Sequence, residues 1–115
     1  MIDLVENSKK VSFKTTEGIF LCKAEEILYF QIKSNRTKAS LKNGKSFSFS
    51  KPLKELETIY GSKDFVRVHQ SYLVNKNYIN QLLIKSPSCV VVENDIRIPI
   101  SRRGKKHIKK IFSNS

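Results

Sequence analysis

The sequence predicts a β-rich α+β domain, and three observations lead to that fold class. Most of the 115 residues fall into short apolar segments of strand length, separated by turn residues. Residues 50–61 and 101–112 have the apolar spacing of short helices. The length and the 39% hydrophobic content are typical of one globular domain. We therefore expect several antiparallel hairpins, a mid-chain helix and a short basic C-terminal helix in a single domain, 1–115, with its core at about 11–112.

The first half of the chain predicts five strands, two of them in a hairpin around Asn43-Gly44. Residues 10–16, KVSFKTT, alternate so that Val11 and Phe13 share one side, and Glu17-Gly18 predicts a turn into IFLCK. Residues 26–32, EILYFQI, are nearly all apolar, which favours a strand in the centre of a sheet.

Asn43-Gly44 predicts the next hairpin, and the apolar pattern selects its register. A two-residue loop would place the two phenylalanines of the second strand on the wrong face. A three-residue loop, 42–44, pairs Ala39 with Phe47 and keeps the apolar residues together. We therefore expect the longer loop, with Gly44 in a left-handed bulge.

A helix is expected next, with Ser50 as its cap, Pro52 near its first turn and Gly61 at its end. The residues expected on its inner face are Leu53, Leu56 and Ile59, with Tyr60 at the end of the stripe.

The second half predicts four more strands and the basic helix. The strands are FVRVH, YINQLLIK, CVVVE and IRIPI, with turns at 86–88 and 94–95. Pro99 restricts the last strand to an edge or an end. The closing helix, SRRGKKHIKKIF, is expected to dock through Ile108, Ile111 and Phe112.

Charge limits the class of partner. The chain has 22 Lys and Arg against 10 Asp and Glu, a net charge of +12, and no acid follows Asp95. Such an excess favours a polyanion, either nucleic acid or an acidic membrane surface. The absence of a long apolar run and the acids near the N-terminus predict a cytoplasmic protein. Cys22 and Cys89 are interpreted as small buried hydrophobes.

An enzyme is not favoured. His69 and Ser71 have no acid beside them in sequence, although a spatial triad with Asp64 or Glu93 stays open. The two histidines have no metal-ligand spacing, and no glycine-rich phosphate loop is present. We expect no catalytic residue, no metal and no cofactor.

Three polar clusters favour nucleic-acid binding instead. They are KSNR at 33–36, HQS at 69–71 and SRRGKK at 101–106. Arg and Lys can pair with guanine, and Asn and Gln can pair with adenine. Arg and Lys can also neutralise phosphates. The candidate DNA-binding residues are Lys33, Ser34, Asn35, Arg36, His69, Gln70, Arg102, Arg103, Lys105 and Lys106.

Three further residues near these clusters have open roles. Arg67 could pair with an acid or a phosphate, and Asn75 could be a turn residue or a contact. His107 is interpreted as a solvated or capping side chain.

Four segments resemble the LytTR family of DNA-binding domains. FVRVHQSYLVNKNYI resembles the family signature F-x-R-x-H-x-S-[YF]-x-V-N-x-x-x-I. EILYFQIKSN, LKNGKSFSFSKPLKELE and IPISRRGKKHIKKI resemble its other segments in the right order, from Val11 to Phe112. Within the signature, the residues that read as core are Phe65, Val68, Tyr72, Val74 and Ile79.

The resemblance implies a transcription regulator that places three loops, instead of a recognition helix, against double-stranded DNA. Family members read direct repeats in successive major grooves and bend the duplex. By position, the contacting residues would be Asn35, then His69 and Gln70, then Arg102 and Arg103. Which arginine enters the groove stays open, and the target sequence cannot be transferred because Asn35 and Gln70 stand at variable positions.

The resemblance also bears on partners. Most relatives carry an N-terminal receiver domain, and we expect none in this sequence. We therefore expect either an excised piece of a response regulator or a stand-alone regulator with another control, such as a membrane protein. We expect a monomer that pairs on direct-repeat DNA. The alternatives are an RNA-binding or ribosome-associated β-domain and, third, an adaptor on an anionic membrane.

Overall fold

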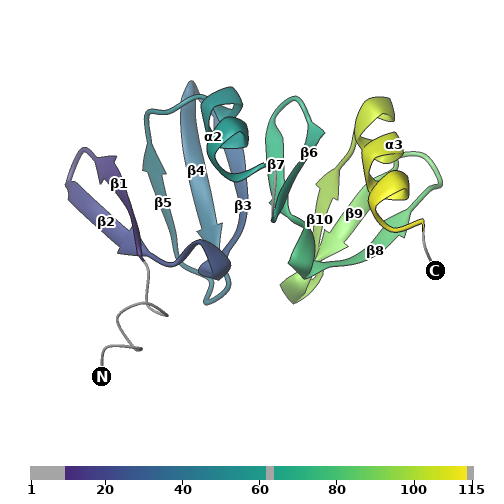
Figure 1. Ribbon diagram of the computed structural model, residues 1–115, viewed down its shortest axis with the longest axis horizontal. Helices are drawn as coiled ribbons and strands as arrows, with labels where there is room; N and C mark the ends of the chain where they lie inside the picture. The colour runs from purple at the N-terminus through teal and green to yellow at the C-terminus, as the bar shows by residue number, and fades with distance from the viewer. Residues whose placement is uncertain (1–9, 62–63, 114–115) are drawn as a thin grey trace.

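The computed structural model describes residues 10–61 and 64–113, and Figure 1 shows how their elements follow one another along the long axis. Short 3-10 turns lie at Ala24–Glu26, Lys76–Tyr78 and Glu93–Asp95. Within the described residues the helices are α2 (Leu53–Tyr60) and α3 (Arg102–Ile111). The strands are β1 (Val11–Thr15), β2 (Gly18–Cys22), β3 (Ile27–Lys33), β4 (Arg36–Leu41), β5 (Ser46–Phe49), β6 (Phe65–His69), β7 (Tyr72–Asn75), β8 (Ile79–Leu83), β9 (Cys89–Val92) and β10 (Ile96–Pro99).

The strands form three antiparallel sheets, as the β-rich prediction requires. The largest has the order β5-β4-β3-β7-β6, so β3 is central and the prediction for residues 26–32 is confirmed. The strands β10-β9-β8 form a second sheet, and β1-β2 form a separate hairpin. In Figure 1 this hairpin lies at one end of the molecule, and the second sheet with α3 lies at the other.

The hairpin between β4 and β5 has the predicted register. Ala39 pairs with Phe47, and the amide of Leu41 donates to the carbonyl of Lys45 over 2.9 Å. Gly44 has φ +90°, a left-handed conformation that glycine adopts without steric cost. The apolar face, more than the Asn-Gly pair alone, therefore determined the loop length.

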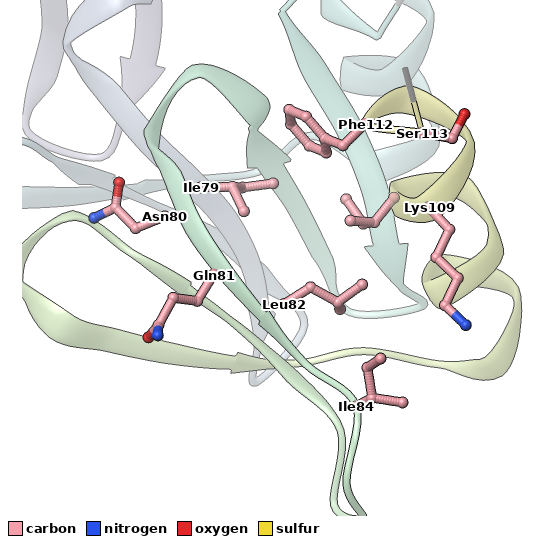
Figure 2. Close-up of a pocket in the computed structure, with 9 residues that line it drawn as sticks. Ile79, Asn80, Gln81, Leu82, Ile84, Lys109, Phe112 and Ser113 are labelled. Atoms are coloured by element: carbon pink, nitrogen blue, oxygen red, sulfur yellow. The ribbon is translucent and has the colours of Figure 1, made fainter. Parts of the chain in front are cut away.

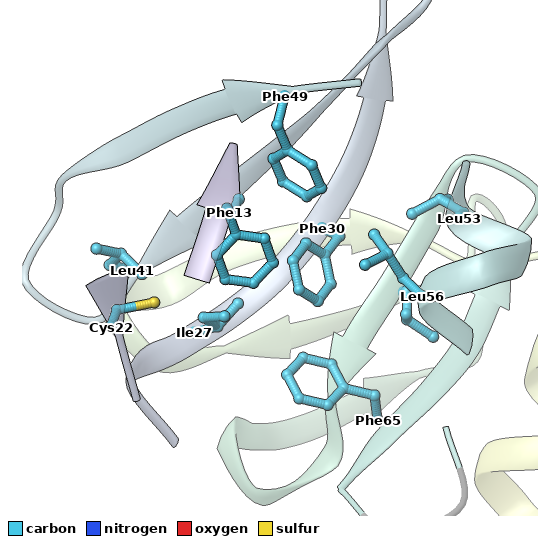
Figure 3. Close-up of a cluster of buried hydrophobic side chains, with 11 residues drawn as sticks. Phe13, Cys22, Ile27, Phe30, Leu41, Phe49, Leu53, Leu56 and Phe65 are labelled. Carbon is cyan, nitrogen blue, oxygen red and sulfur yellow. The ribbon is translucent and has the colours of Figure 1, made fainter. Parts of the chain in front are cut away.

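Two apolar cores lie on opposite faces of the large sheet. The first includes Phe13, Phe30, Phe49, Leu56 and Phe65, beneath α2 and the β1-β2 hairpin (Figure 3). The second joins β6 and β7 to the small sheet and α3; its buried members are Val66, Val68, Val74, Val90, Val92, Ile98 and Ile108. Because side chains alternate along a strand, β6 and β7 contribute to both cores.

The signature residues that were predicted as core lie on β6, β7 and the first position of β8. Phe65, Val68 and Val74 are buried, while Tyr72 and Ile79 are half-buried at the edge of the second core. Cys22 and Cys89 are buried free thiols, as predicted.

Two details of α2 differ from the prediction. Its N-cap position is Pro52, and Ser50 makes no capping bond. Ile59 is 53% exposed, so its assignment to the inner face was wrong. At about 100° per residue, Leu53, Leu56 and Tyr60 form one stripe, and Ile59 lies roughly 90° from its centre. Eight residues are too few for a wider apolar face.

The docking of α3 also differs from the prediction. Ile108 is buried, but Ile111 and Phe112 are 36% and 46% exposed. The buried line of the helix is Gly104 and Ile108, which are four residues apart and therefore lie on one face. Ile111 and Phe112 are thus less buried than the prediction expected, and the prediction did not include Gly104 in the packed face.

Asn75 is a structural residue. Only 1% of it is exposed, its Nδ2 donates to the carbonyl of Ile27 over 3.0 Å, and its Oδ1 accepts from the amide of Asn77 at 3.0 Å. It thus ties the end of β7 to the start of β3. In the described part of the chain, no helix is long and apolar enough to span a membrane.

Candidate nucleic-acid interface

Three loops that are distant in sequence lie in a row along one edge of the molecule (Figure 1). We name them loop 1 (residues 33–36), loop 2 (69–71) and loop 3 (101–106). Hydrogen bonds from the residues beside them connect neighbouring loops. The amide of Ile32 donates to the carbonyl of Ser71 over 3.0 Å, and the amide of Ser101 donates to that of Val68 over 2.9 Å. Loop 2 therefore lies next to both loop 1 and loop 3.

Loop 1 is a tight turn between β3 and β4. Ser34 and Asn35 have φ of 52° and 64°, and Lys33 pairs with Arg36 across the hairpin. Two successive left-handed residues are the pattern of a hairpin turn that follows the twist of the strands. Lys33, Ser34 and Asn35 are exposed, whereas Arg36 is half-buried with its Nη1 3.5 Å from the Ser50 hydroxyl.

Loop 2 presents a histidine whose ring is held in place. The amide of Ser71 donates to His69 Nδ1 over 3.0 Å, and the ring meets that of Tyr72 edge-on, with centroids 5.7 Å apart. Because Nδ1 accepts a hydrogen bond, a neutral His69 carries its proton on Nε2. The ring can then donate to a base acceptor such as guanine N7. Gln70 beside it is exposed.

Tyr72, which contacts this ring edge-on, is itself held in place. Burial, and to a lesser extent Tyr29, raises the pKa of the Tyr72 hydroxyl above its ordinary value. The hydroxyl oxygen accepts a 2.9 Å hydrogen bond from Gln31 Nε2.

Loop 3 is the start of α3. The Ser101 hydroxyl accepts from the amide of Gly104 over 2.9 Å, which caps the helix. Arg102 and Arg103 follow in the exposed first turn. Of the two lysines, Lys105 is half-buried and Lys106 is exposed. Two adjacent guanidinium groups at a capped helix start can reach phosphate or guanine.

A hollow of about 430 Å³ separates loops 2 and 3. Its lining includes His69, Gln70, Arg103 and His107, so both histidines of the sequence meet there. His107 is exposed, and its Nδ1 lies 3.4 Å from the carbonyl of Arg67. A hollow lined with cationic and planar hydrogen-bonding side chains suits the edge of a nucleic acid.

Arg67 and Glu57 also reach this hollow. Arg67 Nη1 lies 2.9 Å from Glu57 Oε1, so the open question about Arg67 resolves as a pairing with an acid. The carboxylate of Glu57, which lines the same hollow as His69, is therefore already paired with Arg67. Within residues 10–61 and 64–113, no group of three or more His, Cys, Asp or Glu gathers as a metal site would need.

A more apolar hollow of about 540 Å³ lies at the other end of α3 (Figure 2). Its lining includes Ile79, Leu82, Ile84 and Phe112. It lies beside the last turn of the helix, whereas loop 3 forms the first turn, so it is separate from the row of loops.

All ten candidate residues lie in the three loops that the fold brings together. Sequence reasoning missed two residues that support them, Glu57 and Gly104. Glu57 looked like any charged residue on the outer face of a helix, and no local pattern distinguishes it. A glycine inside a helical segment was a usable signal for Gly104, because such a glycine often marks a close backbone approach.

Comparison with known proteins identifies the family of this chain. Residues 17–113 match the family model of the LytTr DNA-binding domain. The sensory transduction protein LytT of Bacillus subtilis (strain 168) is 26% identical over 105 residues, which cover 90% of this chain and 43% of LytT. The chain thus spans less than half the length of this relative.

A solved structure shares the fold. It is the LytTr DNA-binding domain of a Bacillus cereus protein described as a methyl-accepting/DNA response regulator. The match has a TM-score of 0.77 at 24% identity and covers 89% of this chain and 94% of that domain.

Proposed function

Because this chain belongs to the LytTr DNA-binding domain family, we propose that it is the DNA-reading part of a bacterial transcription regulator. In this proposal it reads a specific sequence in double-stranded DNA through loops 1, 2 and 3. No catalytic step is part of this function.

The observation that carries the proposal is the row of loops. Residues separated by more than 30 positions are joined by backbone hydrogen bonds into one polar edge on a chain of net charge +12. A long cationic edge with several planar hydrogen-bonding groups matches the two needs of DNA recognition, phosphate neutralisation and base readout.

The side chains divide into two roles. Asn35, His69 and Gln70, with Arg102 or Arg103, are proposed to contact base edges in the major groove. Lys33, Arg36, Lys105 and Lys106 are proposed to contact phosphates, and Ser34 accompanies them in loop 1. If about five phosphates are neutralised, the slope of log affinity against log salt is roughly −4 to −5.

The mode of binding and the partners follow from the family resemblance. We propose that a free monomer pairs on direct repeats, reads successive major grooves and bends the duplex. Since LytT is more than twice the length of the matched region, a receiver domain on the same chain, or a membrane protein acting on it, would supply the signal.

Selection of bound sites from a random duplex pool tests this function. The expected result is enrichment of one motif, repeated in direct orientation, whose binding weakens steeply with salt. Competition with structured RNA at the same salt concentration is the control. No enriched motif, or stronger competition by RNA than by duplex DNA, would overturn the proposal in favour of an RNA-binding role.

A further inference from the structure

We propose that Arg67 is a positioning residue that, together with Glu57, shapes loop 2 for base reading without contacting DNA itself. This inference rests on the proposed function. It assigns a specificity-determining role to an ion pair that lies outside the three loops.

The guanidinium of Arg67 binds the backbone of loop 2 at two successive residues. Nε donates to the carbonyl of His69 over 2.9 Å, and Nη2 donates to the carbonyl of Gln70 over 2.7 Å. These two bonds hold adjacent peptide groups against one rigid, planar group. The peptide orientations determine where the side chains of His69 and Gln70 leave the backbone.

A bulge in β6 places Arg67 for this task. Arg67 pairs with Leu73 and His69 pairs with Tyr72, so Val68 is the extra residue in the ladder. Bulges redirect the side chains around them. Here the carbonyl of Val68 accepts from the amide of Ser101. The side chain of Arg67 reaches along its own strand to the carbonyl of His69, the last residue of β6.

Glu57 accepts a hydrogen bond from the remaining nitrogen of the guanidinium, Nη1. Its Oε1 lies 2.9 Å from Nη1, and the side chains of Arg67 and Glu57 are 24% and 43% exposed. A pair this exposed adds little stability. Its effect is geometric, because an anchor on α2 prevents the guanidinium from rotating away from the two carbonyls.

The same contacts argue against a phosphate role for Arg67. All three of its nitrogens already donate to protein oxygens. A carboxylate at 2.9 Å also offsets the charge that a phosphate would require. A DNA contact would break the bonds that hold loop 2.

The first experiment compares three variants on the selected site and on random duplex across a salt series. Arg67→Lys keeps the charge and loses the planar fork, and Glu57→Gln removes the anchor. Glu55→Gln is the matched control, since it changes the charge of the same helix equally and removes only an exposed pair with Lys51.

Positioning predicts a loss of preference without a change in salt dependence. Arg67→Lys is expected to lower the preference for the selected site about 10-fold, Glu57→Gln several-fold, and Glu55→Gln not at all, as for a misaligned base contact. Binding to random duplex and the salt slope should stay as in the wild type. Equal losses on both duplexes, a reduced slope, or unchanged preference in Glu57→Gln would overturn the proposal.

The second experiment uses the protein without DNA. The amide of Ser71, which donates to His69 Nδ1, reports on the shape of loop 2. Its hydrogen exchange should quicken in Glu57→Gln and not in Glu55→Gln, while the melting temperatures stay within a few degrees. Unchanged exchange would overturn the positioning role even if Arg67→Lys failed to fold. If the wild type prefers no duplex, the proposed function fails, and this measurement still tests loop 2.

Discussion

Gly104 on α3 lies directly against the carbonyl of Val68 on β6. A β-carbon at residue 104 would stand 2.0 Å from that oxygen, far inside contact distance. The same carbonyl accepts the amide of Ser101 at 2.9 Å. Helix α3 therefore begins on the bulged residue of β6 with no space for a side chain, and loop 3 is built directly on the strand that carries loop 2.

This contact predicts that Gly104→Ala destabilises the protein. Inside a helix, alanine is favoured over glycine by about 1 kcal/mol. Here the added methyl must push α3 away from β6, and overpacking of this kind costs about 1–3 kcal/mol. Urea unfolding should show lower stability than the wild type, with Lys106→Ala, exposed on the same helix, close to neutral. Increased stability in Gly104→Ala would show that the contact is not present.

Asn75→Ala should also lower stability, by another route. It leaves the carbonyl of Ile27 and the amide of Asn77 without their partner in a buried site. The expected loss is about 2–3 kcal/mol in urea unfolding. At a temperature where the variant is folded, its salt slope of DNA binding should match that of the wild type. A reduced slope would show that Asn75 contacts phosphate, the role that the sequence left open.

The strands and their registers could be predicted because one face of each is buried. The loop 42–44 is an example: only one register placed Ala39 and Phe47 on the same face, and the structure has it. The errors occurred where elements meet. Ile59 and Ile111 are apolar, but both are exposed. Their exposure depends on which face of each helix packs against the sheets, and the sequence around them does not show this.

The candidate site could be predicted as three polar clusters but not as a connected surface. Their contact depends on the carbonyls of Val68 and Ser71, and backbone groups leave no mark on the sequence. The role of Glu57 depends on α2 packing beside β6, a tertiary contact between residues ten positions apart. Residue types thus identified the groups that could face DNA, while the groups that support them needed the fold.

Stability should fall in alkaline solution because of Cys22. Burial, and then the charge of Glu26, raises the pKa of its thiol from 9.0 to about 11. The unfolded chain therefore releases this proton first, so the stabilisation is complete below pH 9 and is lost as the pH rises towards 11. The expected loss is on the order of 2 kcal/mol. Urea unfolding across this range should show a shallower decline in Cys22→Ala, and parallel curves would contradict the assignment.

Asn35→Ala tests base reading by loop 1. If the amide pairs with a base edge, binding to the selected site should weaken by about 1–3 kcal/mol and binding to random duplex far less. Asn43→Ala is a control, since this exposed asparagine lies in the β4–β5 loop, at the other end of β4. Affinities from fluorescence anisotropy on both duplexes would decide, and equal losses would remove Asn35 from the reading surface.

Loop 3 allows base and phosphate contacts to be separated within one helical turn. Arg103→Ala should cost about 1–3 kcal/mol on the selected site and much less on random duplex, as expected when a guanidinium pairs with guanine. Lys105→Ala should weaken both duplexes equally and reduce the salt slope by about 1, since one phosphate contact is lost. Arg102→Ala, measured in the same series, identifies the reading arginine by the pattern it follows. If Arg102→Ala lowers the preference for the selected site and Arg103→Ala lowers only the salt slope, Arg102 is the reading arginine and Arg103 contacts phosphate. If all three variants change the slope alone, loop 3 binds the DNA backbone, and specificity resides in loops 1 and 2.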